Sequence, residues 1–215
     1  MTEYYIPTSD GDAEYVEKRS RFLGKVRHVK SEEEARAFID SVKKRYYDAR
    51  HNCWCYRIRE RGIIRYSDDG EPQGTAGQPM LNVFEKEDIT DVVCVVTRYF
   101  GGVLLGAGGL VRAYTKSAKD ALDAAGVSVV RRWVRMLVPC TYKNFERIRQ
   151  ESERFGASIS DTEYGADILI TVLVPEADAE RYIAHIIDFS AGSVKPLEDG
   201  AEYAPVPVRD PIRGE

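Results

Sequence analysis

The segment that most constrains the fold is an apolar run followed by a loop rich in glycine. Residues 92–96 are all apolar, which predicts a buried strand. A helical pattern begins near Leu110 and ends at Gly126, a residue type that favours the position just after a helix. The glycines that lie between strand and helix are Gly101, Gly102, Gly106, Gly108 and Gly109. The order is therefore strand, glycine loop and helix.

The predicted helix has one apolar side and one cationic side. The apolar side consists of Val111, Thr115, Ala118, Leu122 and Ala125. The spacing of Arg112, Lys116 and Lys119 places these three cations on one face. No carboxylate occurs between Asp91 and Asp120, so nothing acidic nearby in the sequence neutralises that face.

This element suits an anionic ligand. Glycine lets backbone N–H groups approach a ligand closely, and a helix N-terminus carries partial positive charge. The alternative is a tight strand-to-helix turn whose cations only solvate the outer face. The loop lacks the closing Gly-Lys-Ser/Thr of a P-loop, and Val111 stands where a dinucleotide fingerprint requires a third glycine. The candidate residues for binding nucleic acid or another anion are Arg98, Tyr99, Phe100, Gly101, Gly102, Gly106, Gly108, Gly109, Arg112, Tyr114, Lys116 and Lys119.

An acidic turn is the second unusual stretch. Asp68, Asp69 and Glu71 precede Thr75, which is expected to cap a short helix. The three carboxylates suggest a divalent-cation site or an acid/base pair, and their mutual repulsion predicts a role in function rather than in folding. The alternative is a solvated turn that uses Asp and Gly for their backbone behaviour. His51 belongs to the same candidate set.

A strand before the acidic turn places His51, Cys53 and Cys55 on one side. These side chains are metal-ligand types, but a fourth ligand at recognisable spacing is missing. Cysteine commonly packs as a small hydrophobe, and core packing is favoured for both cysteines. The sequence therefore predicts no metal site here.

The composition is that of an ordinary globular protein. The chain has 215 residues, with 31 Lys and Arg against 35 Asp and Glu and a formal net charge of -4. Any nucleic-acid surface must therefore be local. No apolar run is long enough to cross a membrane, and no signal peptide is visible, so no membrane partner is expected. Four cysteines without a framework spacing predict a reducing, cytoplasmic location.

The first part of the chain predicts further strands and one helix. Residues 16–29 predict one or two strands, and residues 52–59 and 63–66 predict a hairpin. Ser31 and Glu34 form a capping-box signature at the start of a helix.

A new pattern begins after an edge strand expected at 128–133. Its order is β-α-β-β-α-β, the split βαβ arrangement. The strands are expected at 136–141, 157–164, 168–174 and 193–203, and the helices at 142–155 and 176–189. The predicted organisation is a first domain at 1–133, a second at 134–205 and an extended tail at 206–215.

The two unusual strings resemble the signatures of a known family. Asp68-Asp-Gly-Glu-Pro-x-Gly-Thr-Ala-Gly-x-Pro79 and Arg98-Tyr-Phe-Gly-Gly-x-x-Leu-Gly-x-Gly-Gly-Leu-x-Arg-Ala-Tyr114 look like those of the Impact family, in its bacterial YigZ-type branch. The resemblance covers nearly the whole chain and implies an α+β protein. It implies an N-terminal α/β sandwich like the second domain of a ribosomal small-subunit protein. It also implies a C-terminal ferredoxin-like βαββαβ domain resembling a terminal domain of elongation factor G.

The resemblance also implies a function. Eukaryotic members of the family regulate translation by competing for a scaffold protein, and a further N-terminal domain, not expected in this chain, makes that contact. The expected function is thus translation-linked regulation or binding of RNA, the ribosome or a translation factor, without a cofactor. The alternative is a metal-assisted enzyme that uses the acidic turn and Mg²⁺ on a phosphorylated small molecule. Catalytic residues cannot be assigned, because no nucleophile lies beside an identifiable base.

Overall fold

The computed structural model describes residues 3–212, and these form a mixed α/β protein of two compact units. Among the described residues, Tyr4–Val129 and 207–212 form the first unit, and Val130–Val206 form most of the second. The predicted boundary lay at 133/134, four residues beyond the division at 129/130. Among the described residues, no helix is long and apolar enough to span a membrane.

The first unit is built on a five-stranded antiparallel sheet. The strand order is β2-β3-β6-β4-β5, so the apolar run predicted as a buried strand is the central strand β6. The strands are β2 (Gly11–Glu17), β3 (Ser20–His28), β4 (His51–Ile58), β5 (Ile63–Ser67) and β6 (Val92–Tyr99). A short 3₁₀ turn, η1 (Glu60–Gly62), joins β4 to β5, and the predicted hairpin is confirmed.

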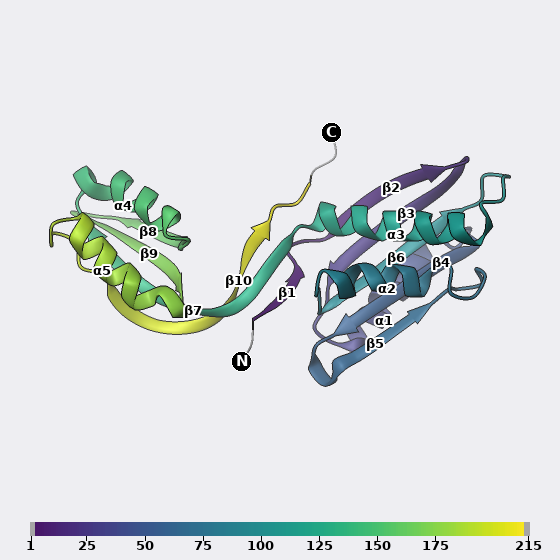
Figure 1. Cartoon of the computed structure of the whole chain (residues 1–215), viewed down its shortest axis with the longest axis horizontal. Helices are drawn as coiled ribbons and strands as arrows, with labels where there is room; N and C mark the ends of the chain where they lie inside the picture. Colours follow the sequence, from purple (N-terminus) through teal and green to yellow (C-terminus); the bar gives the residue numbers. More distant parts are fainter. Residues whose placement is uncertain (1–2, 213–215) are drawn as a thin grey trace. The chain divides into compact units, whose positions relative to one another are not determined.

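Helices cover both faces of this sheet (Figure 1). α1 (Glu32–Arg45) packs on one face, and α2 (Gly77–Lys86) and α3 (Gly106–Ala125) pack on the other. Successive side chains of a strand point to opposite faces, so Val93 and Val95 of β6 pack toward α1, whereas Cys94 packs toward α2 and α3. Residues 92–96 of β6 are all apolar because neither face of this stretch meets water.

Helix α3 lies unusually close to the sheet. A Cβ atom on Gly24 of β3 would lie 2.5 Å from the backbone oxygen of Ser117, and one on Gly11 of β2 would lie 2.1 Å from that of Ala121. Glycine is therefore required at both strand positions. This close packing fixes the second half of α3 against β2 and β3.

The N-terminal end of α1 follows the prediction for Ser31, whereas Glu34 bonds the N–H one residue before the one a capping box uses. The Ser31 hydroxyl accepts a hydrogen bond from the Glu34 N–H at 3.2 Å, as an N-cap does, while the Glu34 carboxylate accepts from the Lys30 N–H at 2.7 Å. The prediction for the apolar side of α3 was partly wrong, because Val111 is 36% exposed. The buried side instead consists of Leu110, Ala113, Tyr114, Ser117, Ala118, Ala121, Leu122 and Ala125.

The second unit has the predicted β-α-β-β-α-β order. Its strands follow the order β7-β9-β8, and β10 and the short β1 (Tyr4–Pro7) also pair with β7. The elements are β7 (Val127–Cys140), α4 (Tyr142–Arg154), β8 (Ser158–Tyr164), β9 (Ile168–Pro175), η2 (Glu176–Asp178), α5 (Ala179–Phe189) and β10 (Leu197–Arg209). Ile148 and Ser152 of α4 and Tyr182 of α5 are buried.

Two sequence boundaries differ from the prediction in this region. The edge strand expected at 128–133 and the strand expected at 136–141 are one continuous strand, β7, because no turn residue separates them. The last strand reaches Arg209, so the predicted tail begins inside β10. The end of the tail, residues 213–215, lies outside the described residues.

Candidate functional site

Asp68 of the acidic turn is the N-terminal cap of α2. One carboxylate oxygen accepts hydrogen bonds from the Ala76 and Gly77 N–H groups at 3.0 and 2.9 Å, and the other accepts from the Gly74 N–H at 2.7 Å. The Ala76 and Gly77 groups are among the N–H groups that a helix start leaves without partners. The prediction that Thr75 caps this helix was wrong, since its hydroxyl donates instead to the Pro72 carbonyl at 2.6 Å.

Asp69 joins the turn to β4 and α1. Its carboxylate pairs with Lys43 at 2.7 Å and accepts from the Asn52 N–H at 2.7 Å. The backbone carbonyl of Asp69 lies 2.9 Å from Nδ1 of His51. Asp69 has a positive φ of 43°, a conformation that Asp tolerates better than most residues. His51 and Asp69 therefore brace the turn.

Glu71 lies in a buried charged network. Its Oε1 accepts from the Arg98 guanidinium at 2.7 Å and from the Tyr114 hydroxyl at 2.8 Å. The side chains of Arg98 and Glu71 are only 8% and 3% exposed. Burial is the main reason that the pKa values of Tyr114 and the neighbouring Cys53 thiol lie far above their usual ranges. Both groups are therefore neutral at physiological pH.

This geometry corrects the expectation that the acidic turn serves function rather than folding. Asp68, Asp69 and Glu71 each accept bonds from different parts of the first unit, so a compensating donor faces each charge. The three carboxylates do not converge on one point, and the described residues contain no group of three His, Cys, Asp or Glu side chains placed to hold a metal ion. Cys53 and Cys55 are buried in the core, as predicted.

Two residues that were predicted to bind an anion, Arg98 and Tyr114, belong to this buried network. Arg98 is 7% exposed and Tyr114 is fully buried, so neither can contact phosphates or stack on bases at the surface. Sequence periodicity cannot reveal this, because their partner Glu71 lies far away along the chain. Tyr99 is half-buried and donates its hydroxyl to Asp48 at 2.7 Å.

The glycines of the loop have different structural roles. A Cβ on Gly101 would lie 2.0 Å from the backbone carbon of Arg19, and its N–H donates to the Ser20 hydroxyl at 3.1 Å. Gly102 and Gly106 have positive φ values of 83° and 70°. One turn later in α3, a Cβ on Gly108 would meet only the tip of a flexible arginine at 3.6 Å.

The predicted cationic face of α3 is partly neutralised within the structure. Lys116 pairs with Asp120, and Lys119 pairs with Asp123 and with Glu87 at 2.9 Å. Burial alone would lower the pKa of Lys119, but the hydrogen bonds to the two carboxylates outweigh it and raise that pKa. Arg112 is exposed and makes no ion pair with the described residues. The expectation that nothing acidic neutralises the face holds only for Arg112.

A cationic turn that was not predicted lies beside the glycine loop. Lys18 and Arg19 form the two-residue connection between β2 and β3, and the residues on either side, Glu17 and Ser20, face each other in the strand register. Both connecting residues have positive φ values, 46° and 65°. A type I′ turn requires this conformation, and Asn and Gly are the residues that adopt it readily. Both cations are exposed to solvent.

The turn and the start of α3 together form a cleft of about 310 Å³. Lys18, Arg112 and Lys116 are its cations, and Glu17 is its one carboxylate. The remaining lining residues are Tyr15, Leu105, Gly109 and Ala113. We call this cleft, together with Arg19 of the adjoining turn, the cationic cleft. Leu105 precedes α3 and makes no side-chain cap, so the helix start contributes partial positive charge to the same place.

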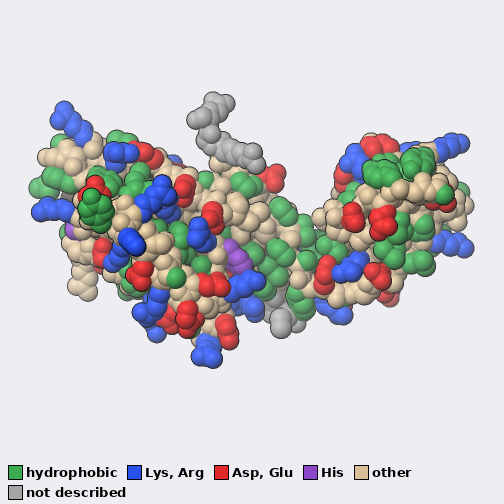
Figure 2. Space-filling view, turned by 180° about the vertical axis from the view of Figure 1, so that it is seen from behind, with side chains coloured by type: hydrophobic (Ala, Val, Ile, Leu, Met, Phe, Trp, Pro, Cys, Tyr) green, Lys and Arg blue, Asp and Glu red, His purple; other side chains and the backbone are tan. Residues whose placement is uncertain are grey.

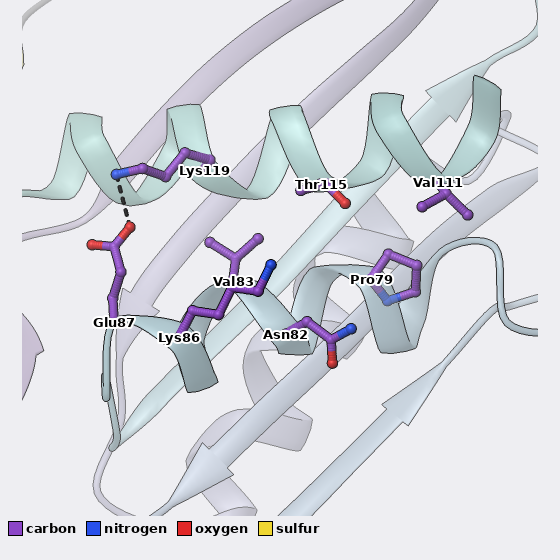
Figure 3. Close-up of a pocket in the computed structure, with 8 residues that line it drawn as sticks. All are labelled: Pro79, Asn82, Val83, Lys86, Glu87, Val111, Thr115 and Lys119. Atoms are coloured by element: carbon purple, nitrogen blue, oxygen red, sulfur yellow. Dashed lines mark ion pairs between the residues drawn. The ribbon is translucent and has the colours of Figure 1, made fainter. Parts of the chain in front are cut away.

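A second cleft, of about 390 Å³, lies between α2 and α3 (Figure 3). Pro79 and Val83 from α2 and Val111 from α3 give it an apolar floor. Its Lys119 is paired with Glu87, as the dashed line in the figure marks. Burial would raise the pKa of Glu87, but Lys119 and Arg209 more than offset it, and the pKa is lowered. Lys119 is therefore compensated here, and Lys86 is the one lining cation that has no ion pair with the described residues.

The surface charges on the face shown in Figure 2 are mixed. Lys and Arg side chains alternate there with Asp and Glu side chains and form no broad patch of one sign. The glycine loop differs from this background, because Phe100, Val103 and Leu104 are 48%, 41% and 83% exposed. Apolar side chains and cations thus meet at one end of the first unit.

Two family descriptions match separate parts of the chain. Residues 18–122 match the Impact N-terminal domain, and residues 138–193 match a domain of unknown function, DUF1949. The matched ranges correspond to the two units of the structure.

Bacterial proteins are similar over nearly the full length. The IMPACT family member YvyE of Bacillus subtilis is 37% identical over 194 residues, which cover 89% of each chain. The IMPACT family member YigZ of Escherichia coli is 34% identical over 200 residues, which cover 92% of this chain and 98% of YigZ. A crystal structure of a hypothetical protein, 33% identical in sequence, matches with a TM-score of 0.58 and covers 92% of this chain and 97% of its own.

Proposed function

We propose, because this chain belongs to the IMPACT family, that it is a translation-linked regulatory protein that binds RNA through the cationic cleft. The translation-linked part of this proposal rests on membership of the family. The sequence resemblance implies that eukaryotic members of this family regulate translation. The RNA-binding part rests on the cationic cleft. Ribosomal RNA is a ligand that would account for both the link to translation and the binding of RNA.

The observation that carries the proposal is the turn Lys18-Arg19. Left-handed backbone conformations are costly for long side chains, and residues held in them cluster at functional sites. Asn and Gly would form the same turn with less strain, yet the sequence places two cations there. The need to present positive charge at this surface explains why Lys and Arg occupy the turn, whereas the requirements of folding would favour Asn and Gly.

The surrounding groups support an anionic, extended ligand. Arg112 and Lys116 line the same cleft from α3, and the helix start adds partial positive charge. Exposed arginine and lysine side chains hold phosphates by charge and hydrogen bonding without reading a sequence. Because the chain as a whole carries a net charge of -4, such binding must come from the local cations, and contacts between exposed cations and phosphates weaken with salt.

The test is a salt titration of a fluorescent single-stranded RNA. Each phosphate contacted contributes about −0.7 to the slope of log affinity against log salt, so three contacts give roughly −2. The variant Lys18→Asn with Arg19→Gly removes two cations and relieves the strained turn. It should lower the magnitude of the slope by about 1.4 units and weaken binding at low salt. Its melting temperature should rise or stay constant, because the turn becomes easier to form.

A matched control removes as much charge elsewhere. Lys44 and Arg45 are exposed at the end of α1, which packs on the opposite face of the sheet from α3. Neutralising these two residues, as Lys44→Gln with Arg45→Gln, removes two cations as the turn variant does and leaves the cationic cleft untouched, so the salt slope should stay within error of the wild type. An equal loss of slope in both variants would show that binding follows net charge, and undetectable binding at low salt would refute the proposed function.

A further inference from the structure

We infer that Phe100 is a stacking platform for an unpaired base of the bound RNA. This inference rests on the proposed function and identifies which kind of RNA the cationic cleft takes. Phe100 follows the last residue of β6 and is 48% exposed, although it is an aromatic side chain. An exposed ring at the edge of a cationic surface offers one apolar face to a ligand that also carries negative charge.

A buried cation holds the ring from behind. The guanidinium carbon of Arg98 lies 5.6 Å from the centre of the Phe100 ring and 5.4 Å from that of Phe22. Glu71 fixes Arg98 through a 2.7 Å hydrogen bond, and a longer contact of 3.4 Å leads to Ser20. A cation close to the ring attracts its π electrons and orients it. Phe100 thus contacts the buried network through Arg98 while its ring is partly exposed to solvent.

The backbone next to Phe100 is also fixed. Gly101 fits against the backbone of Arg19 so closely that no larger residue could occupy its place. Its N–H donates to the Ser20 hydroxyl at 3.1 Å. The ring is therefore attached beside the cationic turn, and a nucleotide whose phosphate contacts Arg19 or Lys18 can place its base on the ring.

The kind of RNA follows from which bases are free to stack on the Phe100 ring. Bases in an RNA duplex are stacked on each other, and proteins meet such a duplex through its backbone and shape. Bases of single strands, loops and bulges are free to stack on aromatic side chains. Stacking of this kind changes affinity by roughly 5- to 150-fold per base and depends little on which base is present. We therefore expect a preference for unpaired RNA without strong sequence selection.

The experiment uses the full chain and a short RNA with 2-aminopurine at its centre, as a single strand and annealed to its complement. Phe100→Leu keeps an apolar side chain but removes the ring, and Phe100→Trp restores a ring. Leu104→Ala is the matched control, because Leu104 lies in the same loop and is 83% exposed. Melting temperatures verify that each variant is folded.

The expected result has three parts. Phe100→Leu should weaken single-strand binding at least fivefold and remove the change in 2-aminopurine fluorescence, while the salt slope and duplex binding stay unchanged. Phe100→Trp should retain both the affinity and the fluorescence change. Leu104→Ala should behave as the wild type.

Two results would overturn the inference while leaving the proposed function intact. In one, salt-dependent binding persists and Phe100→Leu equals the wild type in affinity and fluorescence. In the other, Leu104→Ala loses as much affinity as Phe100→Leu, which would indicate an apolar contact of the whole loop, as with a protein partner. Absence of any salt-dependent RNA binding by the wild type would refute the proposed function as well.

Discussion

Replacing Glu71 with glutamine tests the central structural claim, that the acidic turn holds the fold together. The substitution keeps the shape of the side chain and removes its charge. Arg98 would then remain buried, 7% exposed, without an anion beside it. The Tyr114 hydroxyl, which donates to the same oxygen at 2.8 Å, would retain only a neutral acceptor.

The expected cost is large because the lost partner is buried. Removing one member of a buried ion pair destabilises a protein by about 3–5 kcal/mol, since the remaining charge has no compensation. For a unit of this size the loss corresponds to a decrease of roughly 10–20 °C in melting temperature. Asp69→Asn is the comparison, because the pair of Asp69 with Lys43 is partly exposed and solvent screens it. Its loss should be less than a third as large.

Thermal unfolding followed by calorimetry and circular dichroism measures both variants. A third variant combines Glu71→Gln with Arg98→Met, which removes the unpaired buried charge, and should regain most of the lost stability. If Glu71→Gln were as stable as the wild type, the ion pair would contribute nothing to folding and our interpretation of the turn would fail. If the double variant were no more stable than the single one, an uncompensated charge would not be the cause.

Three further predictions follow from individual contacts. Gly101→Ala should lower the melting temperature strongly because its Cβ would collide with the backbone of Arg19, whereas Gly108→Ala should stabilise α3 by up to about 1 kcal/mol; equal effects would contradict these packing assignments. Burial lowers the pKa of His28 below 6.5, so the unfolded chain binds more protons than the folded one in that region, and stability should fall as the pH drops below about 6.5. His28→Gln should flatten this dependence between pH 7 and 5, and an unchanged profile would exclude His28 as its source. A fragment covering residues 130–206 should show a cooperative thermal transition, and poorly dispersed amide signals would argue against an independently folding second unit.

Local sequence patterns predicted most of the secondary structure. The apolar run of β6, the capping residues of α1 and the alternating segments of the second unit each depend on neighbours a few residues apart. Hydrophobic periodicity reports such relations directly. Continuous β7 was predicted as two strands because a domain boundary was expected at 133/134, and the backbone passes from Val127 to Cys140 without a break.

The glycine-rich and acidic strings identified the family, and the tertiary structure decided what their residues do. Both strings looked functional as a whole, because a single sequence shows charge and glycine without showing partners. Folding brings Glu71 against Arg98 and Tyr114, so residues that seemed to form an anion site and an acid site neutralise each other in the core. A buried charge needs a partner, and that partner can lie anywhere along the chain.

The cationic turn, in contrast, could not be identified from the sequence. Lys18 and Arg19 carry no motif, and the sequence alone gives no reason to select them from 31 lysines and arginines. Their significance appears only when the strand register makes them a two-residue turn with left-handed backbone and when Gly101 packs against it. The sequence thus determined the elements and the family. The folded chain alone decided which cations face solvent together, because strand pairing joins residues that are remote in sequence.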